Sequence, residues 1–81
     1  MNNAETVGYT GRMGDVLQYR HRPEEGEEGW QDNQNYRGEC DDALWRSILN
    51  WGFDGNPANR YRVVRPGMFA RDVVAKGRYG F

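Results

Sequence analysis

The sequence has very few of the side chains that build disulfides and metal centres. Its 81 residues contain one cysteine, Cys40, and one histidine, His21. A single thiol excludes a disulfide within the chain and fits a reducing compartment. A zinc site needs four nitrogen or sulfur ligands, or three and a water molecule. We therefore expect neither a metal ion nor a cofactor.

Long apolar runs are also missing. No apolar run of about 18 or more residues occurs, which predicts that no helix spans a membrane. The first residues, MNNAETVGYTG, have neither a basic start nor an apolar run, so we expect no signal peptide. The expected location is cytoplasmic.

Motifs for catalysis are likewise missing. The eleven glycines form no dinucleotide or phosphate-loop pattern, and Gly11 and Gly14 are better explained by a turn. A Cys40–His21 pair is a conceivable nucleophile and base. However, Asp41 and Asp42 would raise the pKa of the Cys40 thiol, and nothing places His21 near it. We expect a protein that is not an enzyme and has no catalytic residues.

Aromatic residues are what the chain does have. They make up 14% of it, whereas its mean hydropathy is −1.02. Rings bury large areas, and disordered chains lack them, so we expect one small folded domain over residues 1–81. Charge is divided unevenly along this domain. Residues 1–42 carry ten acids and four arginines, hence −6, and residues 43–81 carry seven bases and two acids, hence +5. The halves either form opposed patches or neutralise each other on folding.

The pattern of residues predicts a fold of the α+β class. Residues 15–22 alternate as a strand, with Leu17, Tyr19 and His21 on one face. Strands are also expected at 30–36 and 60–65, the latter with Tyr61 and Val63 sharing a face. The expected architecture is a small antiparallel sheet of about three strands packed against one main helix, with a short C-terminal helix.

The main helix is expected to begin at Asp41 or Asp42, which can cap it, and to end at Gly52. Leu44, Ile48 and Trp51 follow at helical spacing with Trp45 and Leu49 beside them, whereas Arg46, Ser47 and Asn50 fall on the opposite side. Trp45 and Trp51 are expected in the core. Residues 68–76 favour a short helix, because Phe69 and Val73 are four residues apart, although a strand remains an alternative. The tail is expected to be tethered by Tyr79 or Phe81.

Two segments are candidates for binding. The first is an acidic loop whose side chains would contact a partner: Glu24, Glu25, Glu27, Glu28, Trp30 and Asp32. It lacks the spacing of a calcium loop. Trp30 either anchors an interface or pins the second strand to the sheet. The second is a basic surface formed by Arg60, Arg62 and Arg65, with Tyr61 available for stacking on a base. An ordinary amphipathic strand, whose arginines pair with the acids, explains it better because the net charge is −1.

Taken together, the Tyr-Arg first strand, Gly29-Trp30, the single helix and Tyr61-Arg62-Val63-Val64 resemble small accessory proteins of bacteriophages. These include inhibitors of host enzymes and anti-CRISPR proteins. The resemblance implies a protein that acts in the host cytoplasm by occluding a surface of a larger complex, such as a nucleic-acid-processing or CRISPR-type defence complex.

Three functions are therefore weighed. The preferred one is a non-enzymatic inhibitor or modulator that binds a larger protein or nucleoprotein complex, with the acidic loop in a basic groove. The alternatives are a small nucleic-acid-binding module and a minor structural or oligomeric phage component. The sequence leaves the oligomeric state open.

Overall fold

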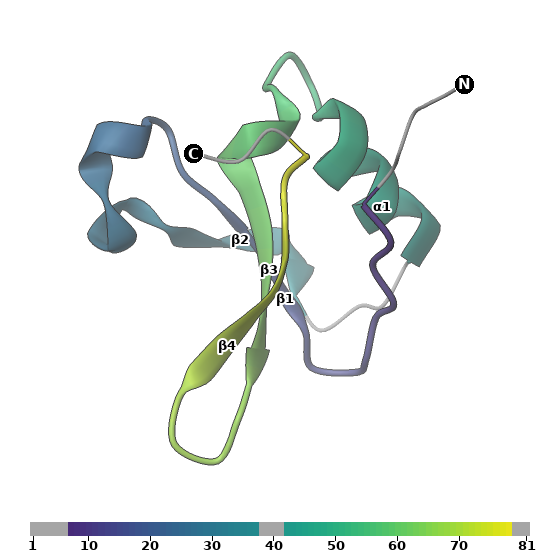
Figure 1. Ribbon diagram of the computed structural model, residues 1–81, viewed down its shortest axis with the longest axis vertical. Coiled ribbons are helices and arrows are strands. Elements are labelled where there is room, and N and C mark those ends of the chain that lie inside the picture. Colours follow the sequence, from purple (N-terminus) through teal and green to yellow (C-terminus); the bar gives the residue numbers. More distant parts are fainter. Residues whose placement is uncertain (1–6, 38–41, 79–81) are drawn as a thin grey trace.

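The computed structural model describes residues 7–37 and 42–78, without the side chains of residues 34–37. Four antiparallel strands form one sheet in the order β2-β1-β3-β4. Figure 1 shows α1 lying against one face of this sheet. The elements are β1 (Val16–Tyr19), β2 (Gln31–Arg37), α1 (Asp42–Trp51), β3 (Tyr61–Pro66) and β4 (Arg71–Lys76). The α+β class and the single main helix are confirmed, with four strands rather than about three.

The core lies between α1 and the sheet face that it covers. Leu17 on β1 is buried together with Tyr61 and Val63 on β3, as the alternation of these strands predicts. From the helix, Trp45, Ile48 and Leu49 pack against them, and the ring of Tyr9 stacks on Trp45 at 5.9 Å between centroids. Aromatic rings thus supply much of the core, because aliphatic residues are scarce.

The helix departs from expectation in its last turn. Asn50 was expected on the outer side, but it is buried, where its amide binds the backbone N–H and carbonyl of Val7. Trp51 was expected in the core, but it is 63% exposed, with the Arg78 guanidinium 4.9 Å from its ring centroid. The segment around Val7 covers the helix next to Asn50, which sequence spacing alone does not reveal. Gly52 ends the helix at φ +92°, as predicted.

The short helix expected over residues 68–76 is wrong, because residues 71–76 form β4. This strand pairs antiparallel with β3, and the pairing shifts register between Val63 and Val64. The β-branched Val73 and Val74 favour an extended chain, and the unpaired side of β3 offers a hydrogen-bonding partner at close range. Segment 30–36 does form a strand, as β2 along β1. The proposed tethers Tyr79 and Phe81 lie outside the described residues.

Candidate interaction surfaces

The face of the sheet turned away from α1 carries a row of polar residues. Register aligns Asp32 on β2, Gln18 on β1, Arg62 on β3 and Lys76 on β4. Gln18 links two of them, since its Nε2 donates to Asp32 Oδ1 at 3.0 Å and its Oε1 accepts from Arg62 Nε at 2.7 Å. Arg62 is only 8% exposed, so its charge needs these partners.

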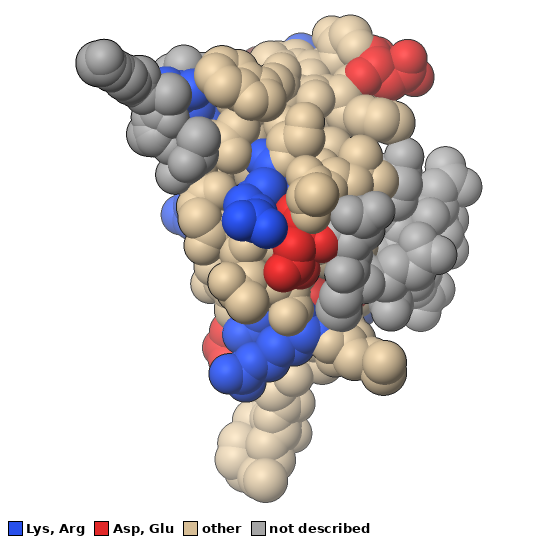
Figure 2. All heavy atoms as spheres, turned by 90° about the vertical axis from the view of Figure 1, so that its right-hand side faces the viewer, with Lys and Arg blue, Asp and Glu red and all other residues tan. Residues whose placement is uncertain are grey.

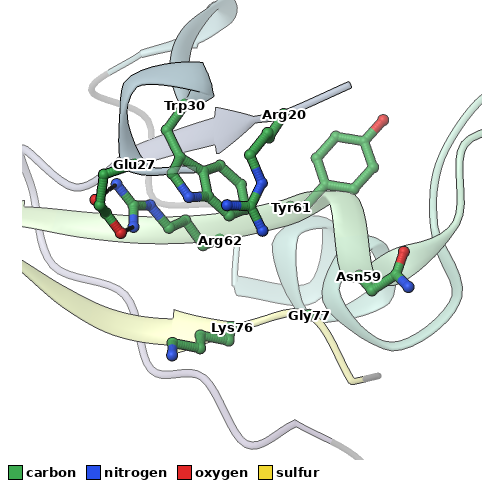
Figure 3. Close-up of a pocket in the computed structure, with 8 residues that line it drawn as sticks. All are labelled: Arg20, Glu27, Trp30, Asn59, Tyr61, Arg62, Lys76 and Gly77. Carbon is green, nitrogen blue, oxygen red and sulfur yellow. Dashed lines mark hydrogen bonds and ion pairs between the residues drawn. The ribbon is translucent and has the colours of Figure 1, made fainter. Parts of the chain in front are cut away.

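Trp30 lies over this row, between two guanidinium groups. The Cζ atoms of Arg20 and Arg62 are each 4.4 Å from the centroid of its ring. Such cation–π contacts contribute about 0.5–2 kcal/mol each, more when water is excluded. Figure 3 shows the side chains of Arg20, Trp30 and Arg62 gathered above β3, with Glu27 at one end. We call Arg20, Glu27, Trp30 and Arg62 the tryptophan cluster. Trp30 thereby fixes the loop that precedes β2 onto the sheet.

Glu27 lies at one end of the tryptophan cluster and forms a bidentate ion pair with Arg62. Its two carboxylate oxygens accept from Arg62 Nη1 at 3.1 Å and Nη2 at 3.2 Å. These hydrogen bonds, followed by the positive charge of Arg62, lower the pKa of Glu27. The Glu27 side chain itself is 78% exposed, so the pair is screened by water and holds the loop only weakly.

A second ion pair lies at the start of β1. Asp15 is buried and accepts hydrogen bonds from Tyr9 Oη, the Arg12 backbone N–H, and Arg65 Nε and Nη2 at 2.8 and 2.9 Å. Burial raises the pKa of Asp15, but the hydrogen bonds from Arg65, Tyr9 and Arg12 outweigh it and lower this pKa to about 2. The same contact raises the pKa of Arg65.

The two charge halves pair with each other at three points, so they do not form two wholly separate patches. Within residues 7–37 and 42–78, the three ion pairs are Asp15–Arg65, Glu27–Arg62 and Asp32–Arg71. Each joins an acid of the N-terminal half to an arginine of the C-terminal half. Hydrogen bonding to Asp32 raises the pKa of Arg71, and both Nη atoms of Arg71 reach that carboxylate.

Because of this pairing, only some of the acids that were expected to bind a partner remain exposed. Glu27 and Asp32 are paired within the protein, whereas Glu24, Glu25 and Glu28 are exposed on two 3₁₀ turns at Pro23–Glu25 and Glu27–Gly29. Trp30 is half-buried.

The three arginines of the expected basic surface also lie in different surroundings. Arg62 is buried on the open face of the sheet and Arg65 binds Asp15. Arg60 Nη1 is 3.5 Å from Tyr19 Oη, and Tyr61 is in the core. The three arginines therefore do not meet as an exposed patch with a ring to stack on.

Of the two residues considered as a nucleophile and a base, only His21 belongs to the part of the chain that the structure describes. His21 is exposed and packs its ring edge-on against Tyr19 at 4.9 Å, while Cys40 lies outside the described residues. In the described part of the chain, no three His, Cys, Asp or Glu side chains gather in a way that could hold a metal ion. No helix in that part is both long and apolar enough to cross a bilayer.

The hairpin formed by β3 and β4 ends in an apolar tip that sequence reasoning missed. Met68 is 88% exposed and Phe69 is 94% exposed, and the turn is closed by Gly67 N–H donating to the Ala70 carbonyl at 2.7 Å. Figure 1 shows this hairpin extending from the body of the molecule, and in the face that Figure 2 shows its end is free of charged side chains. We call residues 67–70 the hairpin tip. Pro66-Gly67 between two valine-containing runs was the sequence signal for it.

Comparison of the chain with known protein families, with curated proteins and with solved structures gave no match.

Proposed function

We propose that this protein is a non-enzymatic modulator that binds a larger protein or nucleoprotein complex, and that the hairpin tip inserts into an apolar cleft of that partner. The exposure of Met68 and Phe69 carries the proposal. Large apolar side chains at the end of a hairpin are held away from the core that would otherwise bury them. Binding to a partner supplies that burial.

The energetics suit an anchoring role. Burying a side chain such as Met or Phe contributes about 1.5–3 kcal/mol relative to leaving it in water. Two such side chains on one turn are comparable to the few residues that dominate a protein interface. Because β3 is paired on both sides, with β1 and with β4, the base of the hairpin is braced. Little conformational entropy is therefore lost there on binding.

The charges near the tip favour a protein over nucleic acid or an anionic membrane. The arginines on the two strands of the hairpin nearest the tip, Arg65 and Arg71, are neutralised by Asp15 and Asp32. Asp72 adds a negative charge close to the turn, because its carboxylate would be 3.5 Å from a Cβ at Gly67. Phosphate-rich surfaces are bound through unneutralised cations, whereas each cation among residues 64–66 and 71–73, which flank the tip, is paired with an acid.

The kind of partner follows from the resemblance to phage inhibitor proteins, which implies occlusion of a larger host complex. In this arrangement the exposed Glu24, Glu25 and Glu28 supply the electrostatic part of the contact. Charged rims mainly speed association, whereas buried apolar anchors slow dissociation.

The test compares a tip variant with a matched control. We would capture partners of the tagged chain from its native cell extract, identify them by mass spectrometry, and measure the affinity of the purified pair. The double variant Met68→Ser, Phe69→Ser should weaken binding by at least about 100-fold, because two apolar anchors of about 1.5–3 kcal/mol each are lost. Met13→Ser is the control, because Met13 is also exposed, at 90%, but lies in a different loop.

Both variants should keep the circular dichroism spectrum and Tm of the wild type, since the substituted side chains are not in the core. An affinity unchanged in the double variant would exclude the tip as the contact. Loss of binding when Glu24, Glu25 and Glu28 are changed to Gln, with no effect at the tip, would assign the contact to the acidic loop. A stable self-assembly in light scattering, abolished by the tip variant, would indicate a structural component instead.

A further inference from the structure

A hollow between the end of β1 and the turn that follows α1 is lined by aromatic rings and polar side chains. Its volume is about 350 Å³. Its wall includes the rings of Tyr19, Phe53 and Tyr61 and the side chains of Asp54 and Asn56, and we call these five residues the ring hollow. Figure 1 shows the turn after α1 and the hairpin tip at opposite ends of the molecule, so what the ring hollow binds is independent of the function proposed above.

Contacts within the protein fix the rings of the ring hollow. The ring centroids of Tyr19 and Tyr61 are 5.3 Å apart. Tyr61 is buried and its Oη donates to the Phe53 carbonyl at 3.3 Å, which ties the turn to the start of β3. Within the turn, the backbone N–H groups of Phe53 and Asn56 each donate to the carbonyl of the other residue at 2.9 Å. Because Phe53 is 38% exposed, a ligand can contact it without rearrangement of the turn.

The polar side chains of the ring hollow offer an acceptor and a donor. Asp54 is exposed and takes part in none of the three ion pairs among the described residues. Asn56 Oδ1 accepts from Tyr19 Oη at 3.2 Å, which leaves the Nδ2 group of Asn56 as the donor. Arg60 Nη1 is 3.5 Å from the same hydroxyl. A cationic ligand would therefore be repelled by Arg60 and an anionic one by Asp54, whereas a neutral ligand avoids both repulsions.

We propose that the ring hollow binds a guanine base, as a free nucleotide or as one unit of a single strand. The base is flat and neutral, and bases stack on aromatic side chains. Its edge carries two adjacent N–H donors next to a carbonyl oxygen, which match the carboxylate of Asp54 and the amide of Asn56. Adenine has an unprotonated ring nitrogen in place of one donor, and a carboxylate repels it. The volume lies within the roughly 300–1,000 Å³ that is usual for ligand pockets.

The test titrates the ¹⁵N-labelled full chain with guanosine 5′-monophosphate (GMP) and follows the backbone amide resonances. Those of residues 54–56 should move and saturate, whereas those of Met68 and Phe69 at the hairpin tip should stay in place. Adenosine 5′-monophosphate (AMP) is the matched ligand, because it carries the same ribose and phosphate. Inosine 5′-monophosphate lacks only the 2-amino donor and should bind about fivefold more weakly than GMP, and AMP should bind about 25-fold more weakly, since each hydrogen bond to the carboxylate contributes about a factor of five.

Variants assign the base to individual side chains. Asp54→Asn should weaken GMP binding about 25-fold and leave AMP binding nearly unchanged, because the doubly accepting carboxylate is lost. This variant should keep the fold, since Asp54 has φ +52° and asparagine accommodates that conformation. Asp72→Asn is the matched control and should have no effect, because Asp72 is an exposed acid on β4. Phe53→Leu should weaken GMP and AMP binding alike, by at least about fivefold, through the loss of a stacking ring.

Two pentanucleotides identify the source of the base. Tighter binding of UUGUU than of both UUUUU and GMP would assign the base to a strand, and binding of UUGUU no tighter than that of GMP would assign it to a free nucleotide. Shifts that never saturate, equal affinities for GMP and AMP, or an unchanged GMP affinity in Asp54→Asn would each overturn the proposal. Saturating shifts of residues 54–56 with N-acetylarginine amide but not with GMP would also overturn it and would assign the ring hollow to an arginine of a partner protein.

Discussion

Replacement of Asp15 by Asn should make the free energy of unfolding of this protein depend much less on pH in the acidic range. The pKa of Asp15 is lowered from 3.8 to about 2 by its bonds to Arg65, Tyr9 and the backbone of Arg12, against the effect of burial. A difference of this size corresponds to roughly 2.4 kcal/mol of folding free energy. A domain of 81 residues is expected to be stable by only about 4–12 kcal/mol. This single carboxylate therefore supplies a large share of the total.

The sign of the effect follows from the direction of the shift. Because the pKa is lower in the folded state, the contribution is fully present above the unfolded value and is lost as pH falls toward about 2. At neutral pH, Asp15→Asn should lower the free energy of unfolding by about 2–4 kcal/mol, because Arg65 loses its ionic partner. The gap between wild type and variant should then shrink by about 1.5 kcal/mol between pH 6 and pH 2.5.

Urea unfolding followed by tryptophan fluorescence at a series of pH values measures this gap. Asp72→Asn is the matched control for removal of one carboxylate, since Asp72 is exposed on β4, and at pH 6 its free energy of unfolding should stay within about 0.5 kcal/mol of the wild type. A gap for Asp15→Asn that is equally large at pH 6 and pH 2.5 would show that the loss is one of packing. The reasoning from the ion pair would then be refuted.

Two further substitutions test the packing of the sheet. Gly77→Ala should lower stability by about 1–3 kcal/mol, because a Cβ there would lie 1.9 Å from the Ala58 carbonyl oxygen, whereas Gly8→Ala meets nothing within 4 Å and should be neutral. Leu17→Ala should cost about 2–5 kcal/mol in urea unfolding, because Leu17 on β1 is fully buried in the core that α1 covers, and Met13→Ala should change stability by less than about 0.5 kcal/mol.

Local patterns in the sequence were sufficient to predict β1, β3 and α1, the central elements of the fold. The alternation in DVLQYRHR and RYRVVR predicts β1 and β3, and spacing of apolar residues before Gly52 predicts α1. These signals work because each element buries one of its faces. The same logic failed for β4, an edge strand whose Val73 and Val74 are both partly exposed. Without a buried face, the spacing of Phe69 and Val73 was read as helical.

The candidate sites depend on pairings that the sequence does not contain. The charge division between the halves was visible, but the partner of each arginine is set by strand register. Gln18 aligns with both Asp32 and Arg62, and this alignment brings the acidic loop and the basic strand onto one face. The order of residues alone could not distinguish Glu27, which pairs with Arg62, from Glu28, which is exposed on the same turn.

Neutralisation of the charged halves also determines which surface remains for a partner. Each ion pair described above uses an arginine that could otherwise attract a phosphate backbone, and each uses an acid that could otherwise enter a basic groove. Pairing Arg65 and Arg71 inside the protein leaves the hairpin between them with an apolar end. The division of charge along the chain therefore serves in part to join segments that are far apart in the sequence, and the apolar hairpin tip is the surface that we propose as the anchor for a partner.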